Sequence, residues 1–192
     1  MIPKALVGQS ALLPFLALIA ATGFWGSSFI TVARTLESTD PFTLVFLRFG
    51  VGALLVALWL RSRIFRIPLE TWKMGAVCAV VIYASYLFNH IGLMTILSST
   101  SGFLTALYVP ITPFLFWAIA GRRPELCAFA GAAVAFGGLV LLADPFNLEF
   151  SSSWGEWTTI FSAFLSALEI ILMGRFAPHC KAPEIAFAQI AL

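Results

Sequence analysis

Apolar runs of about 20 residues recur along the whole chain, and this feature restricts the fold more than any other. Of the 192 residues, 60% are apolar and only 10% are charged, whereas soluble domains carry about a quarter charged residues. A run of this length crosses a bilayer as a helix, and unbroken rather than alternating runs favour helices over a barrel. The sequence therefore predicts an all-α, polytopic transmembrane helical bundle.

The runs predict six complete spans and the beginning of a seventh. The six spans cover residues 12–33, 41–60, 72–94, 98–120, 125–143 and 155–176. The seventh run begins near Pro183 and stops at Leu192, which is too short to cross a bilayer. We therefore expect a chain that is truncated inside a helix.

The charges between the spans predict the orientation in the membrane. Nine of the 11 basic residues precede the first span or follow the even-numbered spans, whereas Arg34 lies opposite and Arg48 lies inside a span. The positive-inside rule then places the N-terminus in the cytoplasm. We expect a multi-pass protein of the inner membrane that contacts lipid. The net charge of +2 is too small to indicate a nucleic-acid partner.

Arg48 lies about 12 Å along the second span, near the middle of the membrane. A charge at this depth is costly and is by default a functional-site hypothesis. Arg48 could contact a substrate or counter-ion, or latch two helices together. The alternative is a structural arginine that caps carbonyl groups or extends along its own stem. The sequence leaves both interpretations open.

The fourth span carries a continuous polar stripe at helical spacing, formed by Ser101, Thr105, Tyr108 and Thr112. Prolines at positions 110 and 113 predict a bend beside it. Such a stripe is typical of a water-filled cavity. The alternative is that these hydroxyl groups donate to carbonyls of their own helix.

Polar and aromatic side chains follow helical spacing on two other spans as well. Trp25, Ser28 and Thr31 share a face of the first span, which indicates either an aromatic cavity wall or plain helix packing. Tyr83, Tyr86 and His90 share a face of the third span. His90 is either a proton carrier or a hydrogen-bonded histidine near the outer surface.

The sixth span carries Ser162, Ser166 and Glu169 on one face. Glu169 is expected in the cytoplasmic half, too far in depth from Arg48 for a direct pair. It could couple transport to protons if burial favours its protonated form. A structural carboxylate paired with a basic residue at the inner surface is the alternative. Small residues four apart, such as Gly23 and Ser27 or Gly102 and Ala106, predict close helix approaches.

The sequence contains no motif of an enzyme. It has no His-Glu-x-x-His pair, nucleophile elbow, phosphate loop or paired aspartates. We therefore expect no catalytic residue, no cofactor and no metal site.

Several motifs, taken in order, resemble the repeat of the EamA family in the drug/metabolite transporter superfamily. Trp25-Gly26-Ser27-Ser28-Phe29, Asp40-Pro41 and Phe46-Leu47-Arg48-Phe49 are similar to the beginning of that repeat. Tyr86 with Gly92-Leu93, residues 98–110 and residues 131–142 resemble its third, fourth and fifth helices. The resemblance covers nearly the whole chain, although Gly121-Arg122-Arg123-Pro124 lacks the acidic residue that the family often has there.

The resemblance implies two inverted five-helix repeats with both termini in the cytoplasm. Residues 1–144 would form the first repeat, and residues 145–192 would form the incomplete start of the second. By this interpretation helices eight to ten are absent, and a half-cavity could not alternate its access between the two sides.

The resulting hypothesis is a secondary carrier that exports small metabolites such as amino acids by alternating access around a midplane cavity. Proton coupling and a homodimer are left open. The alternatives are a non-transporting membrane scaffold or partner subunit, or an inactive fragment of a ten-helix transporter that needs its second half. The predicted substrate-binding residues are Trp25, Ser28, Arg48, Tyr83, Ser101, Thr105, Tyr108 and Glu169.

Overall fold

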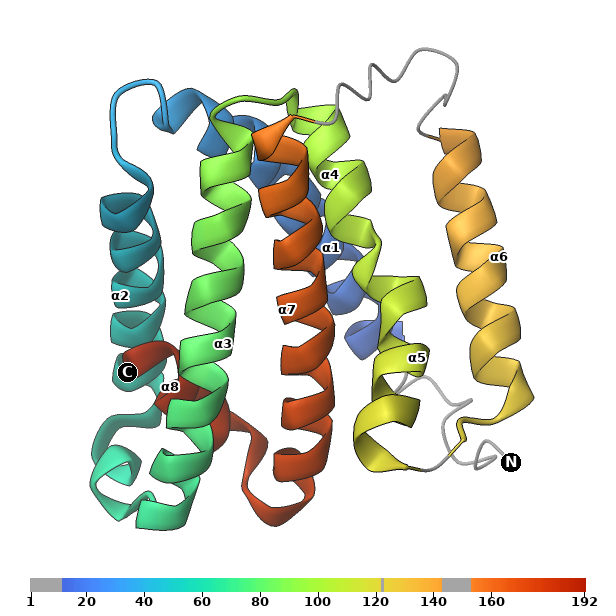
Figure 1. Ribbon diagram of the computed structural model, residues 1–192. Coiled ribbons are helices and arrows are strands. Elements are labelled where there is room, and N and C mark those ends of the chain that lie inside the picture. Colours follow the sequence, from blue (N-terminus) through green and yellow to red (C-terminus); the bar gives the residue numbers. More distant parts are fainter. Residues whose placement is uncertain (1–11, 122, 143–152) are drawn as a thin grey trace.

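The computed structural model describes residues 12–121, 123–142 and 153–192, and these residues form helices and no strands (Figure 1). The predicted all-α class is confirmed. The α-helices are α1 (Leu12–Thr35), α2 (Pro41–Leu60), α3 (Leu69–Leu93), α4 (Ser98–Ala106), α5 (Tyr108–Ala120), α6 (Leu126–Leu142), α7 (Trp154–Phe176) and α8 (Ala182–Ala191). Short 3-10 helices, η2 (Arg61–Arg66) and η3 (Ala177–His179), follow α2 and α7.

Five helical segments of the described residues are long and apolar enough to cross a membrane. They are Leu12–Thr35, Pro41–Arg66, Leu69–Leu93, Ser98–Ala120 and Trp154–His179. The fifth predicted span corresponds to α6, an apolar helix of 17 residues, and the seventh run corresponds to α8. A polytopic membrane protein follows from these lengths.

Local sequence explains where α2 and α7 begin. Asp40 has an extended backbone, and its carboxylate accepts a hydrogen bond from the Thr43 amide at 2.9 Å, while proline occupies the first turn of α2. Ser153 and Glu156 form a capping box at the start of α7, in which each side chain bonds the other residue's amide. Both helices therefore start at defined residues.

The predicted fourth span is divided at Leu107 into α4 and α5. The Leu107 amide donates to the Leu104 carbonyl at 3.2 Å, a tighter turn than that of an α-helix. Pro110 and Pro113, which lack an amide proton, lie in the first two turns of α5. The ribbon is displaced sideways at this junction (Figure 1), as the two prolines led us to expect.

Helices α3 and α7 lie side by side at the centre of the bundle (Figure 1). A Cβ atom added to Gly92 would meet the Gly155 carbonyl oxygen at 2.6 Å, and one added to Gly155 would meet the Gly92 carbonyl oxygen at 2.9 Å. Only glycine permits this approach of the two backbones. A Cβ atom on Gly75 would meet Ala188 Cβ at 2.5 Å, so α8 packs on α3 in the same way.

The close approaches predicted from small residues were assigned to the wrong glycines. Added Cβ atoms at Gly23 and Gly102 would meet nothing within 4 Å in the part of the chain that the structure describes. Four-residue spacing is common in such an apolar sequence, and the spacing alone does not say which face meets a neighbour. The pairing of Gly92 with Gly155 joins residues far apart in sequence.

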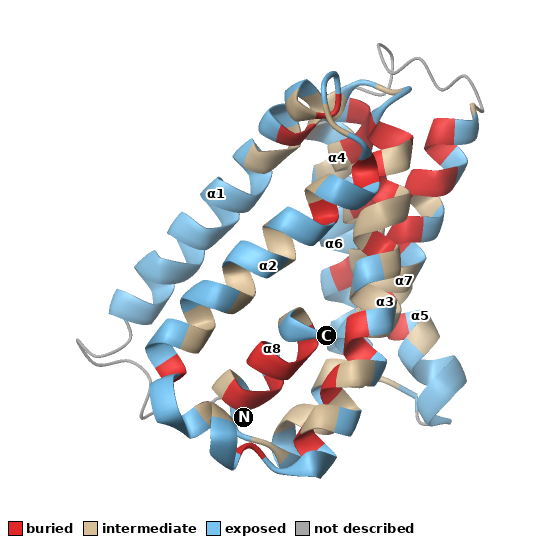
Figure 2. Ribbon diagram, turned by 90° about the vertical axis from the view of Figure 1, so that its left-hand side faces the viewer, coloured by how far each residue is buried: buried red, intermediate tan, exposed pale blue. Residues whose placement is uncertain are grey.

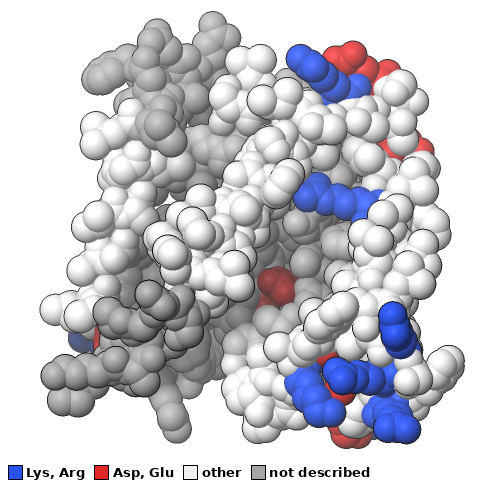
Figure 3. All heavy atoms as spheres, turned by 180° about the vertical axis from the view of Figure 1, so that it is seen from behind, with Lys and Arg blue, Asp and Glu red and all other residues white. Residues whose placement is uncertain are grey.

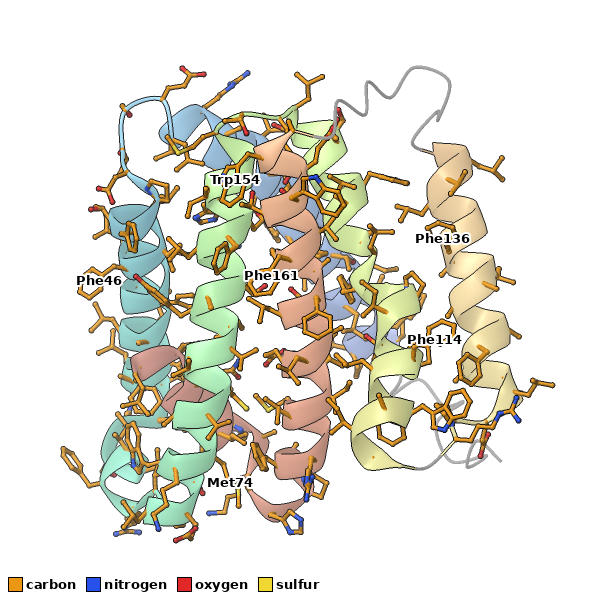
Figure 4. The ribbon with its side chains drawn as sticks, in the orientation of Figure 1. Phe46, Met74, Phe114, Phe136, Trp154 and Phe161 are labelled. Carbon is orange, nitrogen blue, oxygen red and sulfur yellow. The ribbon has the colours of Figure 1, made fainter. Side chains whose placement is uncertain are left out.

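Burial is concentrated in α3, α4, α7 and α8, whereas most of α1 and half of α2 are exposed (Figure 2). The exposed positions are apolar: Phe46 on α2 is 71% exposed and points away from the bundle (Figure 4). Phe114 of α5 lies toward α6, where it contacts Phe129 with ring centroids 5.2 Å apart (Figure 4). An apolar exterior of this kind suits contact with lipid.

Many basic side chains gather at the end of the bundle that carries η2 (Figure 3). The segment from Arg61 to Arg66 follows α2 there, and Lys73 lies in the second turn of α3. The opposite end carries Arg34 at the end of α1. Lys4, Arg122, Asp144 and Glu149, which contributed to the predicted orientation, lie outside the described residues.

Candidate functional site

A cavity of about 260 Å³ lies among α1, α2, α3, α4, α5 and α7. The back of the molecule is visibly hollowed, and acidic atoms lie recessed in the hollow (Figure 3). Apolar wall positions come from residues such as Val32, Ile82 and Leu93. The polar or amphipathic lining residues are Trp25, Ser28, Arg48, Ser85, Tyr86, Asn89, His90, Thr105, Tyr108, Ser162, Ser166 and Glu169.

One wall of the cavity is aromatic. Trp25 of α1 packs against Tyr108, the first residue of α5, with ring centroids 6.3 Å apart and planes at 67°. Trp25 also meets Phe29 one turn along α1, at 5.8 Å and 69°. Both pairs have the edge-to-face geometry that aromatic quadrupoles favour. The break at Leu107 therefore places Tyr108 opposite α1, where it closes this side of the cavity.

Arg48 reaches the cavity from α2 and lies over an aromatic ring of α3. Its guanidinium carbon is 4.9 Å from the centroid of the Tyr86 ring, a cation–π contact. Phe49 packs edge-on against the same ring at 5.2 Å. Arg48 forms no ion pair with any residue of the described ranges, which agrees with the expectation that it and Glu169 do not pair directly.

A group of hydroxyls joins α3 to α7 within the cavity wall. The Ser85 hydroxyl donates to the Ser162 carbonyl oxygen at 3.0 Å, and its oxygen lies 2.7 Å from the Ser166 hydroxyl oxygen. The Ser85 and Ser162 hydroxyl oxygens are 3.3 Å apart. A serine hydroxyl donates one proton and accepts through its oxygen, so Ser85 can donate in only one of these contacts at a time. The three hydroxyl groups can therefore form more than one pattern of hydrogen bonds.

Glu169 lies on the wall of the cavity and is held by α8. The Gln189 side-chain amide donates to one Glu169 carboxyl oxygen at 2.6 Å, and Gln189 is buried. Glu169 makes no ion pair with a basic residue in the described ranges, so the alternative of a carboxylate paired at the inner surface is not found there. Among the described residues that line the cavity, Glu169 carries the only carboxyl group.

Six of the eight predicted site residues line this cavity: Trp25, Ser28, Arg48, Thr105, Tyr108 and Glu169. Tyr83 and Ser101 do not line it. Tyr83 of α3 is 36% exposed, and Ser101 of α4 is fully buried, where its hydroxyl oxygen has no hydrogen-bond partner among the described residues. That the six residues bind a substrate remains a prediction.

Both interpretations of the polar stripe hold for parts of it. Thr105 lines the cavity and also donates to the Ser101 carbonyl of its own helix at 2.7 Å. Thr112 donates to the Tyr108 carbonyl at 2.6 Å and lies outside this cavity. The Ser28 hydroxyl likewise donates to the Trp25 carbonyl at 2.6 Å. Carbonyl bonding and a cavity wall are therefore compatible, because a hydroxyl oxygen can still accept a bond from a solute.

The face of α3 that lines the cavity is rotated by part of a turn from the predicted face of Tyr83, Tyr86 and His90. The lining residues of α3 fall at positions 82, 85, 86, 89, 90 and 93, which is an unbroken helical face. Ser85 and Asn89 belong to this face and Tyr83 does not. The four-residue spacing of Ser85 and Asn89 is the sequence signal that predicts this lining face. His90 is 1% exposed, so the expected surface position is wrong.

Gln189 was not predicted, because α8 reaches Glu169 through tertiary packing that no local pattern encodes. In the described part of the chain, no three residues of the metal-binding types lie close enough to hold a metal ion.

The sequence pattern of the EamA-like transporter family matches residues 12–143. Two proteins of Archaeoglobus fulgidus, each described as an uncharacterized transporter, are both 26% identical to the chain. The first alignment covers 91% of this chain and 52% of the relative, and the second covers 77% and 53%. The chain thus spans about half the length of the curated relatives that it matches. No solved structure matches it significantly.

Proposed function

Because the chain belongs to the EamA-like transporter family, we propose that it carries a small solute across the membrane through the cavity between α1 and α7. The family and the names of the relatives point to a transporter rather than an enzyme. The observation that carries the proposal is a cavity lined in part by polar and charged side chains inside an otherwise apolar bundle. Polar groups at membrane depth mark solute pathways when they face such a cavity.

The size of the cavity supports a small substrate. Pockets for drug-sized ligands occupy about 300–1,000 Å³, and this cavity holds about 260 Å³. We propose a small metabolite such as an amino acid, with Trp25 and Tyr108 as the aromatic wall. Hydrogen bonds would come from Ser28 and Thr105, and charge from Arg48 and Glu169.

For the protein in its working form we propose export across the inner membrane, with the N-terminus in the cytoplasm. Residues 1–144 would be one five-helix repeat, and residues 145–192 the beginning of a second, inverted repeat. Rocking of two such repeats around a fixed site would expose the cavity to each side in turn. Glu169 would be the proton-coupling group, because it carries the only carboxyl group among the described residues that line the cavity.

The test is flux through proteoliposomes that contain the 192-residue chain and a mixture of amino acids, with release measured by mass spectrometry. Tyr108→Ala removes the ring that packs on Trp25 and is expected to lower flux at least about tenfold. Phe46→Ala, on the lipid-facing side of α2, is the matched control and should leave flux unchanged. Equal flux in the two variants would contradict this site.

The alternative is a scaffold or partner subunit that moves no solute. It predicts no flux from the reconstituted chain, and it predicts a stable complex of this chain with a different protein. A mass measurement of the detergent-solubilised protein distinguishes that complex from a monomer or a homodimer.

A further inference from the structure

Arg48 of α2 is a cation that has no counter-ion among the residues that the structure describes. Its described contacts are aromatic: its guanidinium lies over Tyr86, and the ion pairs of the described residues are elsewhere, between Lys73 and Glu70 and between Lys181 and Glu184. A guanidinium inside a span is costly unless an anion or water satisfies its donors. Since Arg48 lines the cavity, a ligand in the cavity can supply that anion.

His90 lines the cavity on the same side as Arg48, and one of its ring nitrogens forms no hydrogen bond within the described structure. The side chain is 1% exposed, and its Nδ1 has no hydrogen-bond partner in the described structure. Its ring meets Tyr86 edge-on, with centroids 6.1 Å apart and planes at 89°. Tyr86 therefore contacts both Arg48 and His90 and fixes them on one wall. A buried nitrogen that lacks a partner requires an explanation, and a ligand in the cavity would provide one.

Glu169, whose carboxyl group lies in the cavity wall, is not the counter-ion of Arg48. Glu169 accepts a hydrogen bond from Gln189 of α8 at 2.6 Å and makes no ion pair with Arg48. Among the described residues that line the cavity, no other side chain carries a carboxyl group. The cation of the cavity therefore remains available to an incoming anion.

We propose that Arg48 and His90 form an anion subsite that receives a carboxylate group of the transported solute. This inference rests on the proposed function and names the chemistry of its substrate. The planar fork of arginine matches the two oxygens of a carboxylate, and an imidazole nitrogen adds a further hydrogen bond. A single guanidinium suits a singly charged carboxylate better than a phosphate dianion, because it balances one negative charge and not two.

The test uses the two histidines of the chain, His90 and His179, as reporters. The purified full chain is labelled with ¹⁵N-histidine in detergent micelles, and the imidazole resonances are assigned with His179→Gln. Acetate or its uncharged analogue acetamide is then added at constant pH and ionic strength. We expect acetate to shift the His90 resonance in a saturable way. Acetamide should do so only at concentrations about tenfold higher or more, and exposed His179 should not respond.

The Arg48 variants decide whether the shift belongs to the subsite. Arg48→Gln should abolish the acetate response, and Arg48→Lys, which keeps the charge without the fork, should weaken it about tenfold or less. Helical circular dichroism and a single gel-filtration peak verify that each variant is folded. Equal responses to acetate and acetamide, no response to acetate, or a response that persists in folded Arg48→Gln would each overturn the subsite.

This measurement needs no transport, so failure of the subsite and failure of the proposed function are distinguishable. An acetate response without flux would keep the subsite and contradict the transporter. Flux that depends on Tyr108 but not on Arg48 or His90 would keep the transporter and overturn the subsite.

Discussion

Thr105 joins two helices from the wall of the cavity. The Asn89 side-chain amide of α3 donates to its hydroxyl oxygen at 2.8 Å, and both residues are buried. Thr105→Val keeps the shape but leaves that amide without its acceptor. We expect the free energy of unfolding to fall by about 1–3 kcal/mol, measured by unfolding in mixed detergent micelles.

Thr112→Val is the matched control for this prediction. The Thr112 hydroxyl donates only within α5, to the Tyr108 carbonyl at 2.6 Å. Its removal should change the free energy of unfolding by less than about 0.5 kcal/mol. Losses of equal size in the two valine variants would mean that the bond between α3 and α4 adds no stability.

Asp40 gives a pH dependence that can be assigned to one residue. Hydrogen bonds from Thr43 lower the pKa of the Asp40 carboxyl below its ordinary value of 3.8. Because the pKa is lower in the folded protein, the stabilisation is present above the unfolded value and is lost as pH falls through the folded value. The group is fully exposed, so the effect should be small.

We therefore expect Asp40→Ala to melt at a lower temperature than the wild type at neutral pH, and the gap to shrink at about pH 3. Circular dichroism in detergent measures both temperatures. A gap that grows on acidification would contradict the role of the carboxylate as the cap of α2.

At the scale of elements, the crossing of α3 and α7 should be the least tolerant contact of the bundle. Gly92→Ala would place a Cβ atom 2.6 Å from the Gly155 carbonyl oxygen and against the Thr159 hydroxyl. Backbone cannot move aside as a side chain can, so we expect a loss of about 1–3 kcal/mol. Gly102→Ala, where nothing lies within 4 Å, should be neutral or stabilising because alanine favours helices. The same unfolding assay compares the two, and equal losses would contradict the packing.

The ends of the helices could largely be predicted from sequence, because local signals determine them. The predicted second span has the same bounds as α2, where Asp40 and Pro41 mark the start. The break at Leu107 was predicted only as a bend from the prolines that follow it. Which helices touch could not be predicted, since glycines such as Gly92 and Gly155 reveal their pairing only in three dimensions.

The candidate site could be predicted in part for a related reason. Isolated polar residues on apolar helices, such as Arg48 and Glu169, are conspicuous, and both line the cavity. The phase of a face is harder to infer, because Tyr83 and Tyr86 satisfy one helical spacing while Ser85 and Asn89 satisfy another. Gln189 bonds Glu169 across 20 residues of sequence, and no periodicity predicts such a contact.

At the scale of the whole molecule, the charge distribution predicts orientation. Basic residues of η2 lie at one end of the bundle and the turn before α2 lies at the other. In a background without Cys78, Cys127 and Cys180, we expect Ser62→Cys to react with an impermeant thiol reagent only after the cytoplasmic side is opened. Ser38→Cys should react in intact spheroplasts. The reverse pattern would contradict the orientation inferred from the positive-inside rule.

The measurement that tests the central claim most directly is solute protection of a cysteine inside the cavity. Ser28 lines the cavity beside Trp25, so Ser28→Cys in the same cysteine-free background reports on its occupancy. The account predicts that an amino acid moved by the protein slows alkylation of this cysteine and leaves alkylation at Ser38→Cys unchanged. Alkylation of Ser28→Cys at the same rate with and without a solute concentration that saturates flux would contradict it.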